Sequence, residues 1–199
     1  SWQHERPKHA TVLGKEQKGV KNLYKLISAS NTQCLFRQPR VLRSLLNQYR
    51  EGLLIGTGDS SGEFWEGLER KGKAFAKQIA TYYDYIEIQP LAAYSIELQR
   101  EMIRDEGRLR ELIKQAIAIG EELGKPVVVT GDAHYLNPED AIYRKILINS
   151  QGGANMLNRY ELPALHFRTT QELLDEFSFL GADIAQQIVV HNTNVVADM

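Results

Sequence analysis

Apolar residues recur along the chain in two alternating patterns, short β-prone runs and stretches with helical spacing. The β-prone runs are residues 10–13, 53–56, 85–89 and 127–130. Helices are predicted over residues 20–27, from about residue 63, over 109–123 and over 138–149. The third of these is an amphipathic helix that ends at Gly124. Because strands and helices alternate, the pattern predicts an α/β fold with a parallel sheet covered by helices.

The pattern changes after residues 150–155, a linker-like Ser-Gln-Gly-Gly-Ala-Asn stretch. Beyond it the chain turns mainly helical, and residues 169–172 form a capping box for a helix that continues through Phe177. We therefore expect an α/β portion over residues 1–150 and a mainly helical segment over residues 151–199.

Composition narrows the class of protein. The chain has 199 residues, of which 43% are hydrophobic and 25% charged, as in an ordinary globular protein with a sizeable core. A net charge of −1 gives no overall attraction to nucleic acid or to an anionic membrane. Cys34 is the single cysteine, which favours a reducing compartment. No apolar stretch approaches the ~20 residues of a membrane span and no signal peptide opens the chain, so we expect a cytoplasmic location and no membrane partner.

The tetrapeptide Gly-Asp-Ala-His at residues 131–134 directly follows the apolar strand 127–130. Asn137 and Pro138 read as the N-cap and first residue of the next helix, which places Asp132 and His134 on a short strand-to-helix loop. There the two side chains can converge, and an oxygen and an imidazole ligand suit zinc, manganese or iron. The alternative is a turn residue beside a hydrogen-bonding histidine.

Three further polar residues lie at or near the predicted strand ends. Asp59 follows the second strand, beside a predicted Ser60–Glu63 capping box whose helix amino terminus can favour a bound anion such as phosphate. The alternative is that Asp59 is a turn residue that satisfies backbone amides. His9 lies at the start of the first strand. The alternation of side chains along a strand does not decide whether His9 points inward to a site or is merely packed. Glu87 sits within an apolar strand, a costly place for a carboxylate unless it is metal-bound or paired, for instance with an arginine.

Seven runs of sequence together carry a family resemblance. They include Lys-His-Ala-Thr-Val-Leu at residues 8–13 and Thr-Gly-Asp-Ala-His-Tyr-Leu at residues 130–136, and the others are residues 19–26, 51–56, 141–148, 150–155 and 167–170. In order and without large gaps, these runs resemble the PHP (polymerase and histidinol phosphatase) domain of PolC-type DNA polymerase III alpha subunits. The resemblance covers nearly the whole chain.

The resemblance implies part of a distorted (β/α)7 barrel, with metal ligands gathered at the carboxyl ends of the strands. His9, Asp132 and His134 match ligand positions of the family. Asp59 matches a position where most relatives carry cysteine in a Gly-Ser-Ala-Cys context, and here residues 56–59 read Gly-Thr-Gly-Asp. Exchanging a thiolate for a carboxylate shifts the metal preference from zinc toward manganese or magnesium.

The family's remaining ligands belong to a part of the domain that precedes an inserted 3′–5′ exonuclease, and this chain resembles the part that follows the insertion. We therefore expect an incomplete ligand shell for the divalent metal. Missing strands would leave unpaired edges and an uncovered apolar face, so we also expect a partner. The first candidate partner is the amino-terminal half of the same domain, together with the polymerase core. The second candidate is another copy of this chain in an oligomer.

Two functional classes remain open for the segment. One is a structural and metal-binding module of a DNA-directed DNA polymerase that reaches DNA through the parent protein. The other is a metal-dependent phosphoesterase or pyrophosphatase acting beside the polymerase. Direct DNA contact by the segment is a third hypothesis, and its alternative is that the charged helix faces are only solvated. It rests on Arg37, Arg40, Arg43, Arg50, Arg100, Arg104, Arg108 and Arg110.

Overall fold

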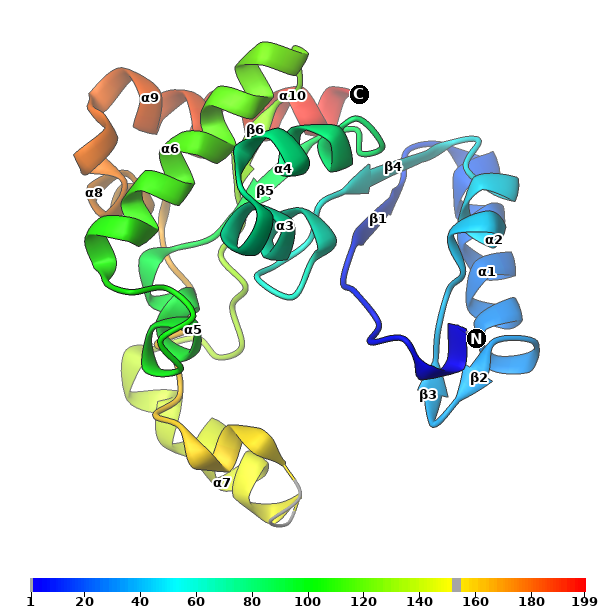
Figure 1. Cartoon of the computed structure of the whole chain (residues 1–199), viewed down its shortest axis with the longest axis horizontal. Helices are drawn as coiled ribbons and strands as arrows, with labels where there is room; N and C mark the ends of the chain where they lie inside the picture. The colour runs from blue at the N-terminus through cyan, green and yellow to red at the C-terminus, as the bar shows by residue number, and fades with distance from the viewer. Residues whose placement is uncertain (1, 152–154) are drawn as a thin grey trace.

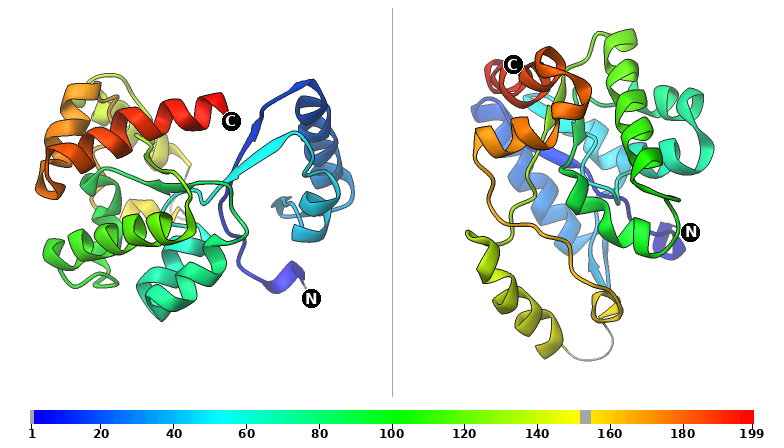
Figure 2. Two further views of the ribbon diagram at one scale, coloured as in Figure 1. Left: turned by 90° about the horizontal axis from the view of Figure 1, so that it is seen from above. Right: turned by 90° about the vertical axis from the view of Figure 1, so that its left-hand side faces the viewer.

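The computed structural model describes residues 2–151 and 155–199. Figure 1 shows two groups of elements connected by the strands β1 and β4, and the view from above in Figure 2 places these strands between the groups. The smaller group carries the amino terminus, and its elements are η1 (Trp2–His4), α1 (Gln17–Thr32), β2 (Leu35–Phe36), β3 (Gln38–Pro39) and α2 (Arg43–Gln48).

The larger group contains the carboxyl terminus and most of the helices. Its first part comprises α3 (Glu63–Lys71), α4 (Lys73–Ala80), β5 (Ile86–Ile88), η2 (Leu91–Tyr94), α5 (Ser95–Gln99), α6 (Glu106–Leu123) and β6 (Val127–Val129). Its second part comprises η3 (Pro138–Asp140), α7 (Ala141–Ser150), η4 (Met156–Arg159), α8 (Thr170–Glu176), η5 (Ser178–Leu180), α9 (Ala182–Gln186), the π-helix η6 (Gln187–His191) and α10 (Asn192–Asp198).

The prediction of an all-parallel sheet is wrong at the first strand. β1 (Thr11–Gly14) pairs antiparallel with β4 (Leu53–Gly56), whereas β5 and β6 pair in parallel. A single parallel bridge between Gly56 and Tyr85 connects the two pairs. The physical reason is the path between β1 and β4: α1 leads the chain away and the segment through β3 and α2 leads it back, so β4 starts beside the end of β1 (Figure 1). The described residues thus form a mixed α/β structure of small sheets.

The main apolar core lies between the β5–β6 pair and the helices α3, α4 and α6. Phe177 and Ile188 from the helical segment are also part of it, and the Asn192 side chain donates a hydrogen bond to the Val127 carbonyl at 2.8 Å. The helical segment therefore packs directly onto the strands. The division at residues 150 and 151 stays a prediction, and residues 152–154 of the predicted linker lie outside the described residues.

Most local end signals are confirmed. Gly124 ends α6 in the left-handed conformation with φ 63°, and Thr169 and Glu172 form the expected capping box of α8. Asn137 precedes η3, and its backbone N–H donates to the Asp140 carboxylate at 2.9 Å. The capping role predicted for Ser60 is wrong, because α3 begins later, with Gly62 at its N-cap. Among the described residues, no helix combines the length and apolar content needed to cross a membrane.

The helix α7 stands apart from the rest of the chain (Figures 1 and 2). Ile148 is its buried residue, while the large apolar side chains Ile142, Tyr143, Ile146 and Leu147 are more than half exposed. Such a row of exposed apolar side chains is typical of a surface that contacts another polypeptide.

Candidate metal site at the strand ends

His9 and Asp59 lie on different segments and meet in space. His9 precedes β1 and Asp59 follows β4, and because these strands are antiparallel the two residues reach the same end of the pair. The His9 Nδ1 lies 2.9 Å from Asp59 Oδ2 and 3.0 Å from Oδ1. The Asp59 Oδ1 also accepts the Ser61 backbone N–H at 2.8 Å. Asp59 therefore does act as a turn residue, and in addition it engages a histidine.

Asp132 and His134 converge after β6, as the sequence predicts. The His134 Nε2 lies 3.3 Å from Asp132 Oδ1, and both side chains are partly exposed. Asp132 has a φ of 46°, in the left-handed region that aspartate tolerates better than most residues. The His134 backbone N–H donates to the Leu165 carbonyl at 2.9 Å, which fixes the loop against the helical segment.

Glu87 of β5 is buried, with 6% of its surface exposed, and the arginine pairing considered from the sequence does not occur among the described ion pairs. Instead its Oε2 accepts the Thr11 hydroxyl at 2.7 Å and the Gly58 N–H at 2.6 Å. Burial raises the pKa of Glu87, the two hydrogen bonds oppose that rise, and the charge of Asp59 adds to it. Glu87 is thus a carboxylate close to the His9–Asp59 pair.

Sequence reasoning found Glu87 unusual but missed its partners. Thr11 and Gly58 gave no signal of their own, because their importance depends on the antiparallel register that brings β1 next to β4. The available signal was indirect: a carboxylate in an apolar strand needs donors, and a hydroxyl and a glycine amide near strand ends can supply them.

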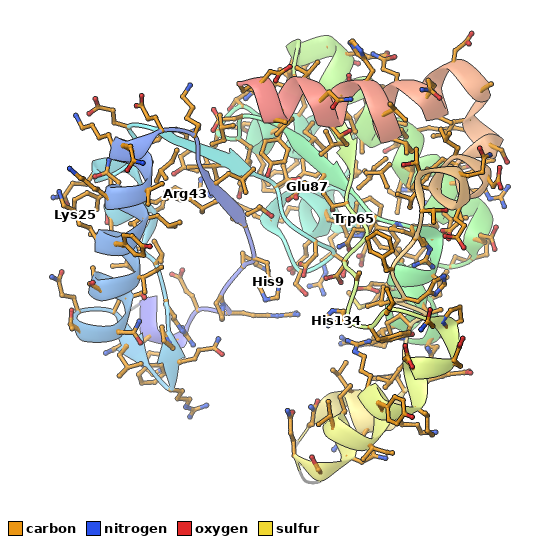
Figure 3. The ribbon with its side chains drawn as sticks, turned by 180° about the vertical axis from the view of Figure 1, so that it is seen from behind. His9, Lys25, Arg43, Trp65, Glu87 and His134 are labelled. Atoms are coloured by element: carbon orange, nitrogen blue, oxygen red, sulfur yellow. The ribbon has the colours of Figure 1, made fainter. Side chains whose placement is uncertain are left out.

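The four candidate ligands suit a divalent metal in kind but fall short in number. Two imidazoles and two carboxylates match the preferences of manganese, zinc or iron. Within residues 2–151 and 155–199, however, no three His, Cys, Asp or Glu side chains gather closely enough to hold a metal ion. In Figure 3, His9 and His134 both lie below Glu87, on the side of the strands that faces α7. The structure thus places the candidate ligands in two separate pairs, His9 with Asp59 and Asp132 with His134.

A cleft of about 750 Å³ opens beside His9, between the amino-terminal segment and the layer formed by α1 and α2. Its apolar lining includes Leu23, Leu26 and Leu46, and charged residues such as Lys8 and Arg43 lie along it. Lys8 pairs with Glu66, and Arg43 pairs with Glu63. The cleft therefore has a mixed polar and apolar lining, and these two cations are already matched by acids.

The arginines considered for DNA contact are largely engaged within the chain. Arg43, Arg50, Arg104, Arg108 and Arg110 all form ion pairs with acidic side chains. Ion pairing of this kind leaves less positive charge for phosphate contacts.

Comparison with known proteins gives two consistent results. The family model described as the PHP domain matches residues 1–101, which include His9 and Asp59. Over all 199 residues the chain is 53% identical to the DNA polymerase III PolC-type of Bacillus subtilis (strain 168). It is 53% identical over 193 residues, 97% of the chain, to the protein of the same name from Latilactobacillus sakei subsp. sakei (strain 23K).

These relatives are much longer than this chain. The chain covers 14% of the Bacillus subtilis protein and 13% of the Latilactobacillus sakei protein. Asp132 and His134 lie beyond the residues matched by the family model but inside the segment shared with the Bacillus subtilis relative. Since the family model covers more than half of the chain, the chain belongs to the PHP domain family.

Proposed function

We propose that the chain is a segment of a PolC-type DNA polymerase III, a replicative enzyme that carries out DNA-templated nucleotidyl transfer and has an associated 3′–5′ exonuclease elsewhere. The observation that carries this proposal is the identity of 53% along the entire chain to a protein of that name. Polymerization and DNA binding would belong to the longer protein, which would act in the cytoplasm.

Within that protein, the segment is a structural and metal-binding module. His9, Asp59, Asp132 and His134 would supply donors to a divalent metal at the strand ends, as part of a distorted (β/α)7 barrel. The hydrogen bond between His9 Nδ1 and Asp59 supports His9 in this role, because metal-binding histidines commonly donate one ring N–H to a carboxylate and bind the metal through the other nitrogen. When bound, the metal would connect these segments and act as a Lewis acid.

The amino-terminal half of the PHP domain is the proposed partner of the open edge of β1 and of the exposed apolar surface near it. Among the described residues, β1 pairs with β4 alone, so its other edge has backbone groups available for a further strand. Leu13, Tyr24 and Ile27 are 40%, 65% and 50% exposed, which leaves apolar surface for that partner to cover. The remaining metal ligands would come with it.

The polymerase core is the proposed partner of α7. Residues 1–150 would be the barrel portion and residues 151–199 the helical segment leading toward the palm. The exposed side chains of Ile142, Tyr143, Ile146 and Leu147 support a contact with another part of the same polypeptide, because burial of such a row would be favourable.

The proposal is tested in the full-length protein that contains this segment. We expect primer extension on a primed DNA template, and calorimetric binding of Mn²⁺ or Zn²⁺ that is weakened by Asp132→Ala and by His134→Ala. Primer extension should survive both variants if the segment is a structural module. Metal-dependent release of phosphate from pyrophosphate or a phosphate ester, lost in both variants, would instead identify the segment as a phosphoesterase. Absence of primer extension would refute the polymerase assignment.

A further inference from the structure

We infer that Glu87 is the positioning residue that holds His9 and Asp59 together at the ends of β1 and β4. This inference deepens the proposed metal-binding role and rests on it for its functional meaning. Its basis is one carboxylate oxygen: the Glu87 Oε2 accepts a hydrogen bond from the Thr11 hydroxyl at 2.7 Å and another from the Gly58 N–H at 2.6 Å.

The two donors belong to the two segments that carry the pair. Thr11 lies two residues after His9 on β1, and Gly58 directly precedes Asp59 after β4. A single buried oxygen on the neighbouring strand β5 therefore connects both segments. The Glu87 N–H adds a third contact, to the Thr57 hydroxyl oxygen at 2.9 Å. Together these bonds restrict how far the β4–α3 loop can move relative to β1.

The loop needs such a restraint because it depends on a glycine. Gly58 has a φ of 76°, in the left-handed region, and a Cβ at this position would lie 3.0 Å from the carbonyl carbon of His9. The loop backbone at Gly58 thus passes very close to the backbone of His9. The His9 N–H also donates to the Ser61 carbonyl at 3.2 Å, which joins the loop to His9 at one point. Since glycine is the most flexible residue, the hydrogen bonds from Glu87 add the restraint at Gly58 itself.

The burial of Glu87 also favours its contacts with Thr11 and Gly58. A buried carboxylate without donors is strongly unfavourable, and the ion pairs of the described residues do not include Glu87. The hydrogen bonds from the Thr11 hydroxyl and the Gly58 N–H offset part of this cost, so burial of Glu87 favours the arrangement in which both donors stay in place.

The test compares Glu87→Leu, Glu87→Gln and the control Glu69→Gln, which removes a half-buried carboxylate from α3. Amide spectra by NMR report the Gly58 N–H, NOEs between the His9 ring and the Asp59 β-protons report the pair, and calorimetry reports Mn²⁺ binding. For Glu87→Leu we expect an upfield shift of the Gly58 amide proton, loss of the NOEs and about 10–100-fold weaker Mn²⁺ binding. Glu87→Gln should retain the NOEs, because its amide oxygen can accept both hydrogen bonds. The control should match the unmodified chain.

The outcomes separate this inference from the proposed function. If Glu87→Leu folds and keeps the His9–Asp59 NOEs, the inference is overturned whatever the metal does. If the unmodified chain binds no Mn²⁺ but the NOEs respond as expected, the inference holds, and His9, Asp59, Asp132 and His134 do not bind the metal without the remaining ligands. If Glu87→Leu does not fold, Thr11→Val decides: loss of the hydroxyl should weaken the NOEs, and unchanged NOEs would overturn the inference.

Discussion

Replacing Phe177 with alanine tests whether the helical segment and the strands unfold as one unit. Phe177 has 0% of its surface exposed and belongs to the core cluster that contains Ile86, Val127 and Trp65. An aromatic side chain of this size buries on the order of 150 Å², which at about 25 cal/mol per Å² corresponds to about 4 kcal/mol. This agrees with the roughly 3–5 kcal/mol typical of buried phenylalanine-to-alanine changes. A loss of that size is a large part of the roughly 5–15 kcal/mol that stabilises a typical domain.

The assay is urea unfolding followed by the fluorescence of Trp65, which packs on Tyr94 at a ring distance of 4.3 Å, in a Trp2→Phe background. Because Trp65 lies on α3, its signal reports the strand-and-helix core and not the helical segment itself. Phe167→Ala is the matched control, since Phe167 is 57% exposed and should cost well under about 1 kcal/mol. The reasoning is refuted if Phe177→Ala leaves the Trp65 transition unchanged, because the segment would then unfold independently.

Three further predictions concern single contacts. Burial, with the charge of Glu63 adding to it, raises the pKa of Tyr83 from 10.0 to about 12. Because the folded state keeps this proton while the unfolded state loses it, the free energy of unfolding should fall between pH 10 and 12 by up to about 3 kcal/mol more than in Tyr83→Phe, measured by denaturant titration. Gly56→Ala would place a Cβ 2.4 Å from the Tyr85 ring and should cost about 1–3 kcal/mol, with a smaller cost in a Tyr85→Leu background; equal costs in the two backgrounds would exclude this clash as the cause. Asp59→Cys should raise the affinity for Zn²⁺ relative to Mn²⁺ in calorimetry, and an unchanged ratio would show that residue 59 does not bind the metal directly.

The parts of the fold that sequence patterns could predict are those fixed by local chemistry. The amphipathic spacing and Gly124 define α6 and its end, and the Thr169–Glu172 box defines the start of α8, because each depends on neighbours a few residues away. Strand direction is not local. The path through α1, β3 and α2 decides that β1 runs against β4, and no spacing within residues 10–13 encodes that path.

The candidate site divides in the same way. Asp132 and His134 are two positions apart on one loop, so the sequence alone could predict that their side chains converge. In the structure the His134 Nε2 lies 3.3 Å from Asp132 Oδ1. The contact between His9 and Asp59 spans fifty positions and could be anticipated only through the family resemblance. The three hydrogen bonds that connect Glu87 to Thr11, Thr57 and Gly58 depend on strand neighbours and could not be predicted from the sequence pattern.

The antiparallel pairing of β1 explains how His9, which precedes a strand, lies beside Asp59, which follows one. In an all-parallel sheet, His9 would lie at the amino end of its strand, a strand length away from Asp59, Asp132 and His134. Reversal of β1 brings His9 to the carboxyl end of β4, next to Asp59, and β5 then contributes Glu87 to hold the two segments in place. Correction of the strand direction therefore strengthens the case for a site at this edge, because it supplies the geometry that the parallel arrangement lacks.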